Sequence, residues 1–125
     1  MDIDRPEVVA QVAAAFTAYE KALVGNDPDE IMAFFHDSPD TVRFGIADRQ
    51  TGWKQQHAWR REQPPLPPGR TLHETRISTF GDDLAVVTTC FSYPGGAAVG
   101  RQSQTWVRLP DGWRIVSAHV SHPAG

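Results

Sequence analysis

Apolar residues in the first part of the chain recur with helical spacing. They stand three or four positions apart over residues 8–23, which predicts an amphipathic helix. Asp4 is predicted to cap the start of this helix, and the Gly-Asn pair at 25–26 to end it. An Asp-Pro pair at 27–28 predicts the start of a second, shorter helix, because an N-cap aspartate followed by proline is a typical start signal.

The middle of the chain combines a strand, a helix and a proline-rich connector. Residues 41–46 alternate, with Arg43 on the face opposite the apolar residues. A turn is expected at 48–52, and residues 53–62 are predicted to form a third helix. The run QPPLPPG at 63–69 can continue neither a helix nor a central strand. We interpret this run as a plain, extended linker.

From residue 70 onward the pattern is that of strands joined by turns that contain glycine. Four long antiparallel strands are predicted, at residues 70–80, 84–93, 100–109 and 113–121. Helices first and strands afterwards indicate the α+β class, with three N-terminal helices on one face of a curved antiparallel sheet. Such a sheet forms a cone-shaped barrel with a cavity where pockets commonly lie. No second-domain boundary is visible, so one domain over 1–125 is expected.

The composition is that of an ordinary globular protein. The chain has 125 residues, of which 40% are hydrophobic and 22% charged. A net charge of -3 argues against a nucleic-acid partner, and no apolar run approaches the ~20 residues of a membrane span. The acidic N-terminus is not that of a signal peptide, and the single cysteine, Cys90, fits a reducing compartment. A soluble, cytoplasmic protein is the expectation.

Arg43 is the first candidate for a functional residue. It stands in the middle of a predicted strand, where a buried guanidinium needs an anionic partner. That partner is either a substrate carboxylate, which a guanidinium binds in bidentate geometry, or an acid of the chain such as Glu20 or Glu74.

Tyr19 is the second candidate, because it lies on the apolar stripe of the first helix and its hydroxyl needs a partner when buried. Near Arg43, the positive charge is expected to lower the pKa of the phenol and to prepare it for proton transfer. The alternative is an aromatic core residue whose hydroxyl bonds to the backbone.

The last hairpin supplies further polar candidates. Gln102, Gln104 and Trp106 are predicted to share one face of the sheet. Their neighbours on that face are expected to be Val116, Ala118 and Val120 of the last strand. Gln104 offers a donor and an acceptor to a urea-like amide, or else bonds within the sheet. His119 alternates onto the other face; it is a candidate for substrate binding, although a lone strand histidine is more often structural.

Metal and cofactor sites are not indicated by the sequence. The other histidines show no ligand spacing with one another or with acids, and no glycine-rich phosphate loop follows a strand. We expect no cofactor.

Four segments together resemble one protein family. These are FTAYEKAL at 16–23, SPDTVRFGIA at 38–47, GRQSQTWV at 100–107 and GWRIVSAHVS at 112–121. The chain resembles the AtzH-like proteins, which include the HpxZ protein of oxalurate catabolism. This family is part of the NTF2-like superfamily, to which SnoaL-type cyclases, ketosteroid isomerase and scytalone dehydratase also belong.

The resemblance implies a small-molecule enzyme of nitrogen-compound catabolism. One AtzH-like enzyme is a decarboxylating amidohydrolase that converts dicarboxyurea to allophanate. The family's proposed catalytic pair falls on Tyr19 and Arg43. In the third helix Trp59 replaces a phenylalanine of the family pattern, and Gln63 stands where an arginine is expected. Arg60 is kept, and its place on a helix that roofs the cavity in this fold makes it a candidate for binding a second carboxylate; the alternative is that it lies on a solvated helix face. Trp59 is a further candidate for substrate binding.

Two hypotheses of different classes follow. The first is a cofactor-independent hydrolase or decarboxylase that acts on a small anionic urea- or amide-type carboxylate. The second is a non-catalytic ligand-binding or oligomerisation module of the NTF2-like fold. It would form a homodimer or higher homo-oligomer through the outer sheet face, with Val99, Val107 and Ile115 pointing outward.

Overall fold

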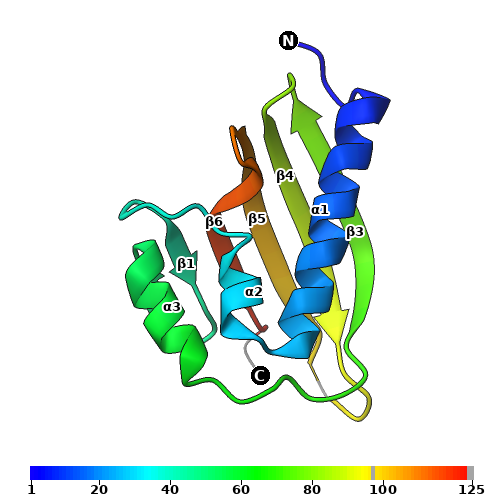
Figure 1. Cartoon of the computed structure of the whole chain (residues 1–125). Coiled ribbons are helices and arrows are strands. Elements are labelled where there is room, and N and C mark those ends of the chain that lie inside the picture. Colours follow the sequence, from blue (N-terminus) through cyan, green and yellow to red (C-terminus); the bar gives the residue numbers. More distant parts are fainter. Residues whose placement is uncertain (97, 124–125) are drawn as a thin grey trace.

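The computed structural model describes residues 1–96 and 98–123 (Figure 1). The elements are α1 (Pro6–Gly25), α2 (Pro28–Met32), β1 (Val42–Phe44), β2 (Arg49–Thr51), α3 (Trp53–Arg61), β3 (Thr71–Phe80), β4 (Leu84–Ser92), β5 (Gly100–Leu109) and β6 (Gly112–Ser121). The expected order of helices and long strands is confirmed. The turn expected at 48–52 instead contains the short strand β2.

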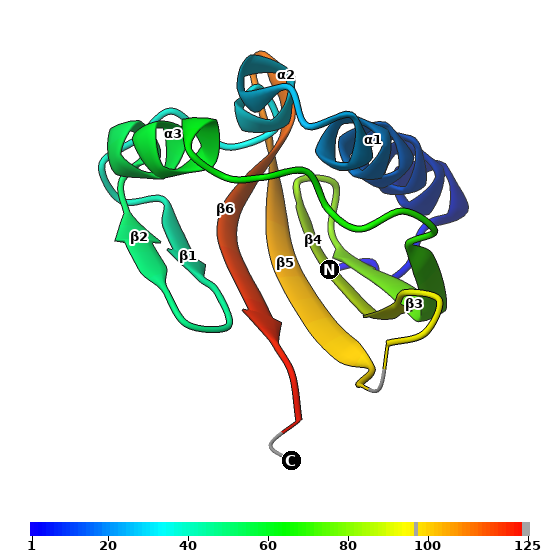
Figure 2. The same cartoon turned by 90° about the horizontal axis from the view of Figure 1, so that it is seen from below.

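The strands form one six-stranded sheet in the order β2-β1-β6-β5-β4-β3. Strands β3 to β6 pair antiparallel in sequence, as predicted, whereas β1 pairs with β6 in parallel. The helices lie on one side of the curved sheet (Figure 2), which confirms the α+β class with N-terminal helices. The sheet stays open between β2 and β3, so it is not a closed barrel.

The ends of the first two helices test the capping residues that the sequence predicts. Asn26 adopts the left-handed conformation that ends α1, and the Asp27 carboxylate accepts hydrogen bonds from the backbone of Asp29 and Glu30 at the start of α2. The prediction that Asp4 caps α1 is wrong. Its amide donates to Thr79 O at 3.0 Å and its carboxylate accepts from Thr79 N at 2.8 Å, so it joins the N-terminus to β3.

A β-bulge at Val116 changes which residues of β6 point inward. Thr105 pairs with Ser117 but Trp106 pairs with Ile115, so Val116 is the extra residue. Ala118 and Ile115 are both buried as a result. The sequence-based expectations that Val116 faces inward beside Trp106 and that Ile115 faces outward are therefore wrong.

The core lies between the helices and the concave face of the sheet. Tyr19 packs edge-to-face against Phe34, Phe35 and Trp106, with ring centroids 5.9 to 6.3 Å apart. Trp106 is fully buried. Within the part of the chain that the structure describes, no helix is long and apolar enough to cross a membrane.

Candidate active site

A cavity of about 360 Å³ opens between α1, β1, α3 and the ends of β4 to β6. Its polar lining consists of Tyr19, Arg43, Arg60, Arg70, Tyr93, Gln102 and His122. Its apolar lining consists of Leu23, Ile46, Leu66, Pro67, Phe91 and Val120. The proline-rich connector, which crosses between the helices and the sheet in Figure 2, thus forms part of the wall and is more than a linker.

Tyr19 projects from α1 into this cavity beside Arg43 and Arg60. Its hydroxyl has no hydrogen-bond partner in residues 1–96 and 98–123, although the residue is only 4% exposed. Burial raises the pKa of Tyr19, and the opposing charges of Arg60 and Arg43 do not offset that effect. The expectation of a lowered pKa is therefore wrong: the phenol keeps its proton and suits a proton donor.

Arg43 has an acidic partner, but neither of the acids that the sequence suggested. Its Nη1 donates to Asp48 Oδ1 at 2.7 Å and to Gln50 Oε1 at 3.0 Å. Gln50 Nε2 also donates to Asp48 Oδ1, at 2.9 Å. Burial opposes ionisation of Asp48, but the bonds from Gln50 and Arg43 outweigh it and lower the pKa of this carboxyl. One edge of the Arg43 guanidinium is thus held by the protein.

Arg70 forms the centre of a fully connected network on the opposite wall. Its Nε donates to Glu20 Oε1 at 2.9 Å, and its Nη2 donates to Gln102 Oε1 at 3.1 Å. Gln102 Nε2 in turn donates to Glu20 Oε2 at 3.1 Å, and Tyr93 Oη accepts from Arg70 Nη1 at 3.1 Å. The sequence prediction included Gln102 but missed Arg70 and Tyr93, and it suggested Glu20 only as a partner of Arg43, because these residues lie far apart in the chain.

Arg60 is the arginine of the cavity without an acidic partner among the described residues. It is 7% exposed, and its Nε is buried without a hydrogen bond. Its guanidinium lies 4.5 Å from the centre of the Trp59 ring, and that of Arg43 lies 4.2 Å from the same ring. Trp59 therefore contacts the two arginines and is not part of the cavity lining. Burial lowers the pKa of Arg60.

Besides Trp59, three more of the residues predicted to bind substrate lie outside this cavity. Trp106 and Gln104 are buried in the sheet, where Trp106 Nε1 donates to Gln104 Oε1 at 3.0 Å. The alternative interpretation, a bond within the sheet, thus describes Gln104. His119 is exposed on the opposite face of the sheet and packs edge-to-face against Phe44, with the ring centroids 5.8 Å apart.

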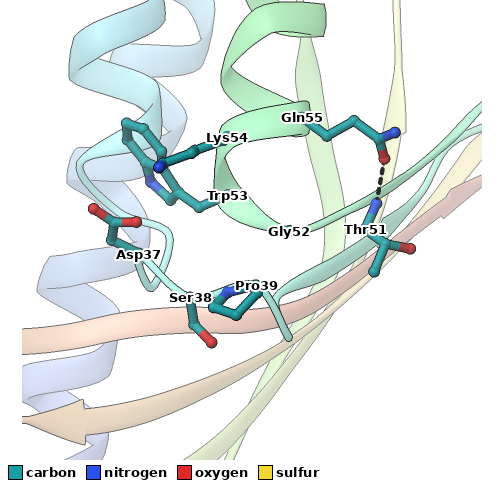
Figure 3. Close-up of a pocket in the computed structure, with 8 residues that line it drawn as sticks. All are labelled: Asp37, Ser38, Pro39, Thr51, Gly52, Trp53, Lys54 and Gln55. Carbon is teal, nitrogen blue, oxygen red and sulfur yellow. Dashed lines mark hydrogen bonds between the residues drawn. The ribbon is translucent and has the colours of Figure 1, made fainter.

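A second pocket, of about 460 Å³, lies at the start of α3 (Figure 3). Its charged residues, Asp37 and Lys54, are both exposed. The amides of Gly52 and Trp53 already donate to the carbonyls of Thr41 and Ser38, in the segment before β1, and Thr51 N donates to Gln55 Oε1 at 2.6 Å. The backbone donors at the start of α3 are therefore already used within the protein.

No group of three metal-ligating side chains is found in the described ranges, 1–96 and 98–123. The chemistry that the cavity can support from its own residues is binding of an anion and donation of a proton.

The chain is similar to solved structures over its whole length. A cystatin-like fold protein from Burkholderia xenovorans LB400 is 50% identical, with a TM-score of 0.95 over 100% of this chain and 98% of that one. A protein of unknown function from the DUF3225 family of Pectobacterium atrosepticum SCRI1043 is 43% identical, with a TM-score of 0.95 over 98% and 96%.

A more distant neighbour identifies the fold. An NTF2-like protein of unknown function from Pseudomonas putida KT2440 is 17% identical, with a TM-score of 0.81 over 97% of this chain and 90% of that one. Among curated proteins no match is found. The sequence model of one family, described as AtzH-like, matches residues 1–124.

Proposed function

The chain belongs to the AtzH-like family and has the NTF2-like fold, and from this premise we propose that it is a cofactor-independent enzyme. Its substrate is a small carboxylate of the urea or amide type, and its reaction is decarboxylation, with or without hydrolysis of a C–N bond. Two functions known in the family fit this proposal: conversion of dicarboxyurea to allophanate, and the role of HpxZ in oxalurate breakdown.

The observation that carries the proposal is the meeting of Tyr19 and Arg43 in one cavity. The phenol comes from α1 and the guanidinium from β1, so the fold alone brings them together. Arg43 uses Nη1 for Asp48 and Gln50, which leaves the rest of its guanidinium for a substrate carboxylate. Tyr19 keeps its proton because burial raises its pKa.

The proposed step balances with these two groups. In an N-carboxylated urea such as dicarboxyurea, the bond between the carboxylate carbon and nitrogen breaks, carbon dioxide leaves, and the electron pair remains on nitrogen. That nitrogen takes the Tyr19 proton, directly or through one water, and the phenol is then reprotonated from solvent. The neighbouring guanidinium groups stabilise the phenolate that exists in between, as preorganised charges do.

The test compares Tyr19→Phe and Arg43→Met with the wild type in an assay of bicarbonate release from the N-carboxylated urea dicarboxyurea. Both variants are expected to lose turnover by at least about 100-fold, the usual contribution of a proton donor. Arg49→Met on the neighbouring strand is the matched control, because Arg49 is exposed. Equal rates in Tyr19→Phe and the wild type would contradict the proposal.

One observation favours the second hypothesis, a non-catalytic binding module. The Tyr19 hydroxyl has no hydrogen-bond partner in the described part of the chain that would relay its proton. This fits a cavity that binds a ligand without reacting with it. In that case ligands stabilise the protein while no ureido carboxylate is turned over.

The same hypothesis includes a dimer formed through apolar surface residues. Phe44 and Val99 are 45% and 47% exposed, and light scattering would show whether the module forms a dimer.

A further inference from the structure

Trp59 contacts two arginines of the cavity without lining the cavity itself. The guanidinium carbon of Arg43 lies 4.2 Å from the centre of the Trp59 ring, and that of Arg60 lies 4.5 Å from it. Both arginines line the cavity, whereas the tryptophan does not. Any effect of this ring on a ligand in the cavity must therefore pass through the two guanidinium groups.

The Trp59 ring brings together two like charges that repel each other. Burial lowers the pKa of Arg60, and the neighbouring charge of Arg43 lowers it further. Asp48 pairs with Arg43, but Arg60 has no acidic partner within residues 1–96 and 98–123. The face of an indole ring is negative and attracts cations, so Trp59 offsets part of the repulsion that would drive the two guanidinium groups apart.

An aromatic face holds a guanidinium group without using its N–H donors. Arg70 shows the other arrangement, because its Nε, Nη1 and Nη2 all donate to side chains of the protein. The hydrogen bonds of Arg43 to Asp48 and Gln50 both come from Nη1. The Nε of Arg60 is buried and has no hydrogen-bond partner in the described part of the chain. Since a guanidinium carries five N–H donors, donors remain on both Arg43 and Arg60 for a ligand.

We propose that Trp59 is a positioning residue, whose ring orients the guanidinium groups of Arg43 and Arg60 before an anion enters the cavity and leaves their N–H donors free to bind it. The anion then meets two side chains that are already ordered, so binding does not include the entropic cost of immobilising them. The inference deepens the proposed function, on which it rests for the identity of the site. It agrees with a substrate such as dicarboxyurea, which carries two carboxylates.

The ligand-free wild type provides the first test. NMR order parameters of the arginine Nε–H groups measure how rigidly each guanidinium is held on the fast timescale. The order parameter of Arg60 is expected to be close to that of Arg70 and clearly above that of Arg61, which is exposed. A value for Arg60 as low as that of Arg61 would overturn the inference, and this measurement does not depend on the folding of any variant.

Two substitutions of Trp59 assign the order to the ring. Trp59→Leu removes the aromatic face, so the order parameter of Arg60 should fall. Malonate, a simple dicarboxylate probe, should bind about 10-fold more weakly in calorimetry, because two side chains must now be ordered on binding. Trp59→Phe keeps a smaller aromatic face and should recover most of this affinity. Equal malonate affinity in Trp59→Leu and the wild type would overturn the inference, as would failure of the wild type to bind malonate.

Trp53 is the matched control, because it is a second tryptophan of α3 with different contacts. Its Nε1 donates to Met32 O at 2.9 Å, and its ring stacks on His57 with the centroids 4.8 Å apart. Trp53→Phe loses the hydrogen bond and should lower the Tm, but it should bind malonate as the wild type does. A loss of affinity equal to that in Trp59→Leu would show that any disturbance of α3 weakens the site, and would overturn the inference.

A double-mutant cycle tests whether Trp59 acts through the arginines. In the Arg60→Met background, Trp59→Leu should weaken malonate binding by a smaller factor than it does in the wild type, because one of the two groups that the ring orients is absent. Equal factors in the two backgrounds would show that the ring acts independently of Arg60, against the inference.

The outcomes separate this inference from the proposed function. Malonate binding that depends on the Trp59 ring, without bicarbonate release from dicarboxyurea, supports the inference and removes the enzyme proposal. Bicarbonate release with an unchanged KM in Trp59→Leu overturns the inference and leaves the enzyme proposal in place.

Discussion

Arg70 and Arg60 line opposite walls of one cavity, and their surroundings differ completely. Arg70 donates from all three of its nitrogens to side chains of the protein, with Glu20 as its ion-pair partner. Arg60 is buried to a similar degree but has a tryptophan ring where an acid would stand. The difference teaches that a buried charge completed by the protein supports the fold, whereas one left incomplete indicates where a ligand binds.

Breaking the paired wall should have the largest effect. Glu20→Gln leaves Arg70, whose side chain is 5% exposed, without its counter-charge. We expect the free energy of unfolding to fall by about 3–5 kcal/mol, as when one partner of a buried ion pair is removed, measured by urea denaturation. Glu7→Gln, in an exposed pair with Arg5, is the control and should change stability little. A loss below about 1 kcal/mol for Glu20→Gln would contradict the comparison.

Removing the unpaired charge should act in the opposite direction. Arg60→Met replaces an uncompensated guanidinium by an apolar side chain of similar length. Since such replacements are neutral or stabilising and the contact with Trp59 is lost, we expect the free energy of unfolding to rise by about 1 kcal/mol. The same urea titration measures it. Equal destabilisation by Arg60→Met and Glu20→Gln would show that the two walls do not differ.

Arg43 lies between these two cases, because it has an acidic partner, Asp48, that is partly exposed. The pH dependence of stability tests this ion pair. The folded-state pKa of Asp48 is lowered, so the stabilisation is present above the ordinary carboxyl pKa and is lost as the pH falls through the folded value. We expect Asp48→Asn to remove up to about 1 kcal/mol near neutral pH, because the Asp48 side chain is 35% exposed. This difference from the wild type should disappear once the pH lies below the lowered folded-state pKa of Asp48. A difference that persists there would have another cause.

The smallest effect on stability is expected at Tyr19. Its hydroxyl makes no hydrogen bond to the described residues, so Tyr19→Phe leaves no partner unsatisfied. The free energy of unfolding should change by less than about 0.5 kcal/mol, while the turnover assay shows a large loss. A destabilisation of about 2 kcal/mol or more would indicate that the phenol serves the fold.

Sequence reasoning predicted the elements and the place of Tyr19 and Arg43, because periodicity and the family motifs are local signals. The partners of the arginines were not predictable in this way. Glu20 and Arg70 are separated by 50 positions, and only the closed fold brings them together. Arg60 and Arg61 look alike in the sequence, although one is buried in the cavity and the other exposed.

Most of the substrate-binding candidates on the last hairpin lie outside the cavity for a different reason. Alternation correctly places Gln102 and Gln104 on the inner face of β5, but it does not say how far along the strand the cavity extends. Gln102 reaches the cavity, while Gln104 lies in the core under Trp106. His119, as the alternation itself indicates, belongs to the other face.

The bulge at Val116 has a consequence for how this protein can vary among relatives. Because the extra residue separates Ile115 from Ala118, the core end and the cavity end of β6 have independent inward and outward phases. Deletion of Val116 would remove the bulge and leave Ile115 and Ala118 two positions apart, still on the same inner face of a regular strand. Substitutions near Val120 can therefore reshape the cavity without disturbing the core, whereas a single-residue deletion away from the bulge would exchange the inward and outward positions of one end of β6.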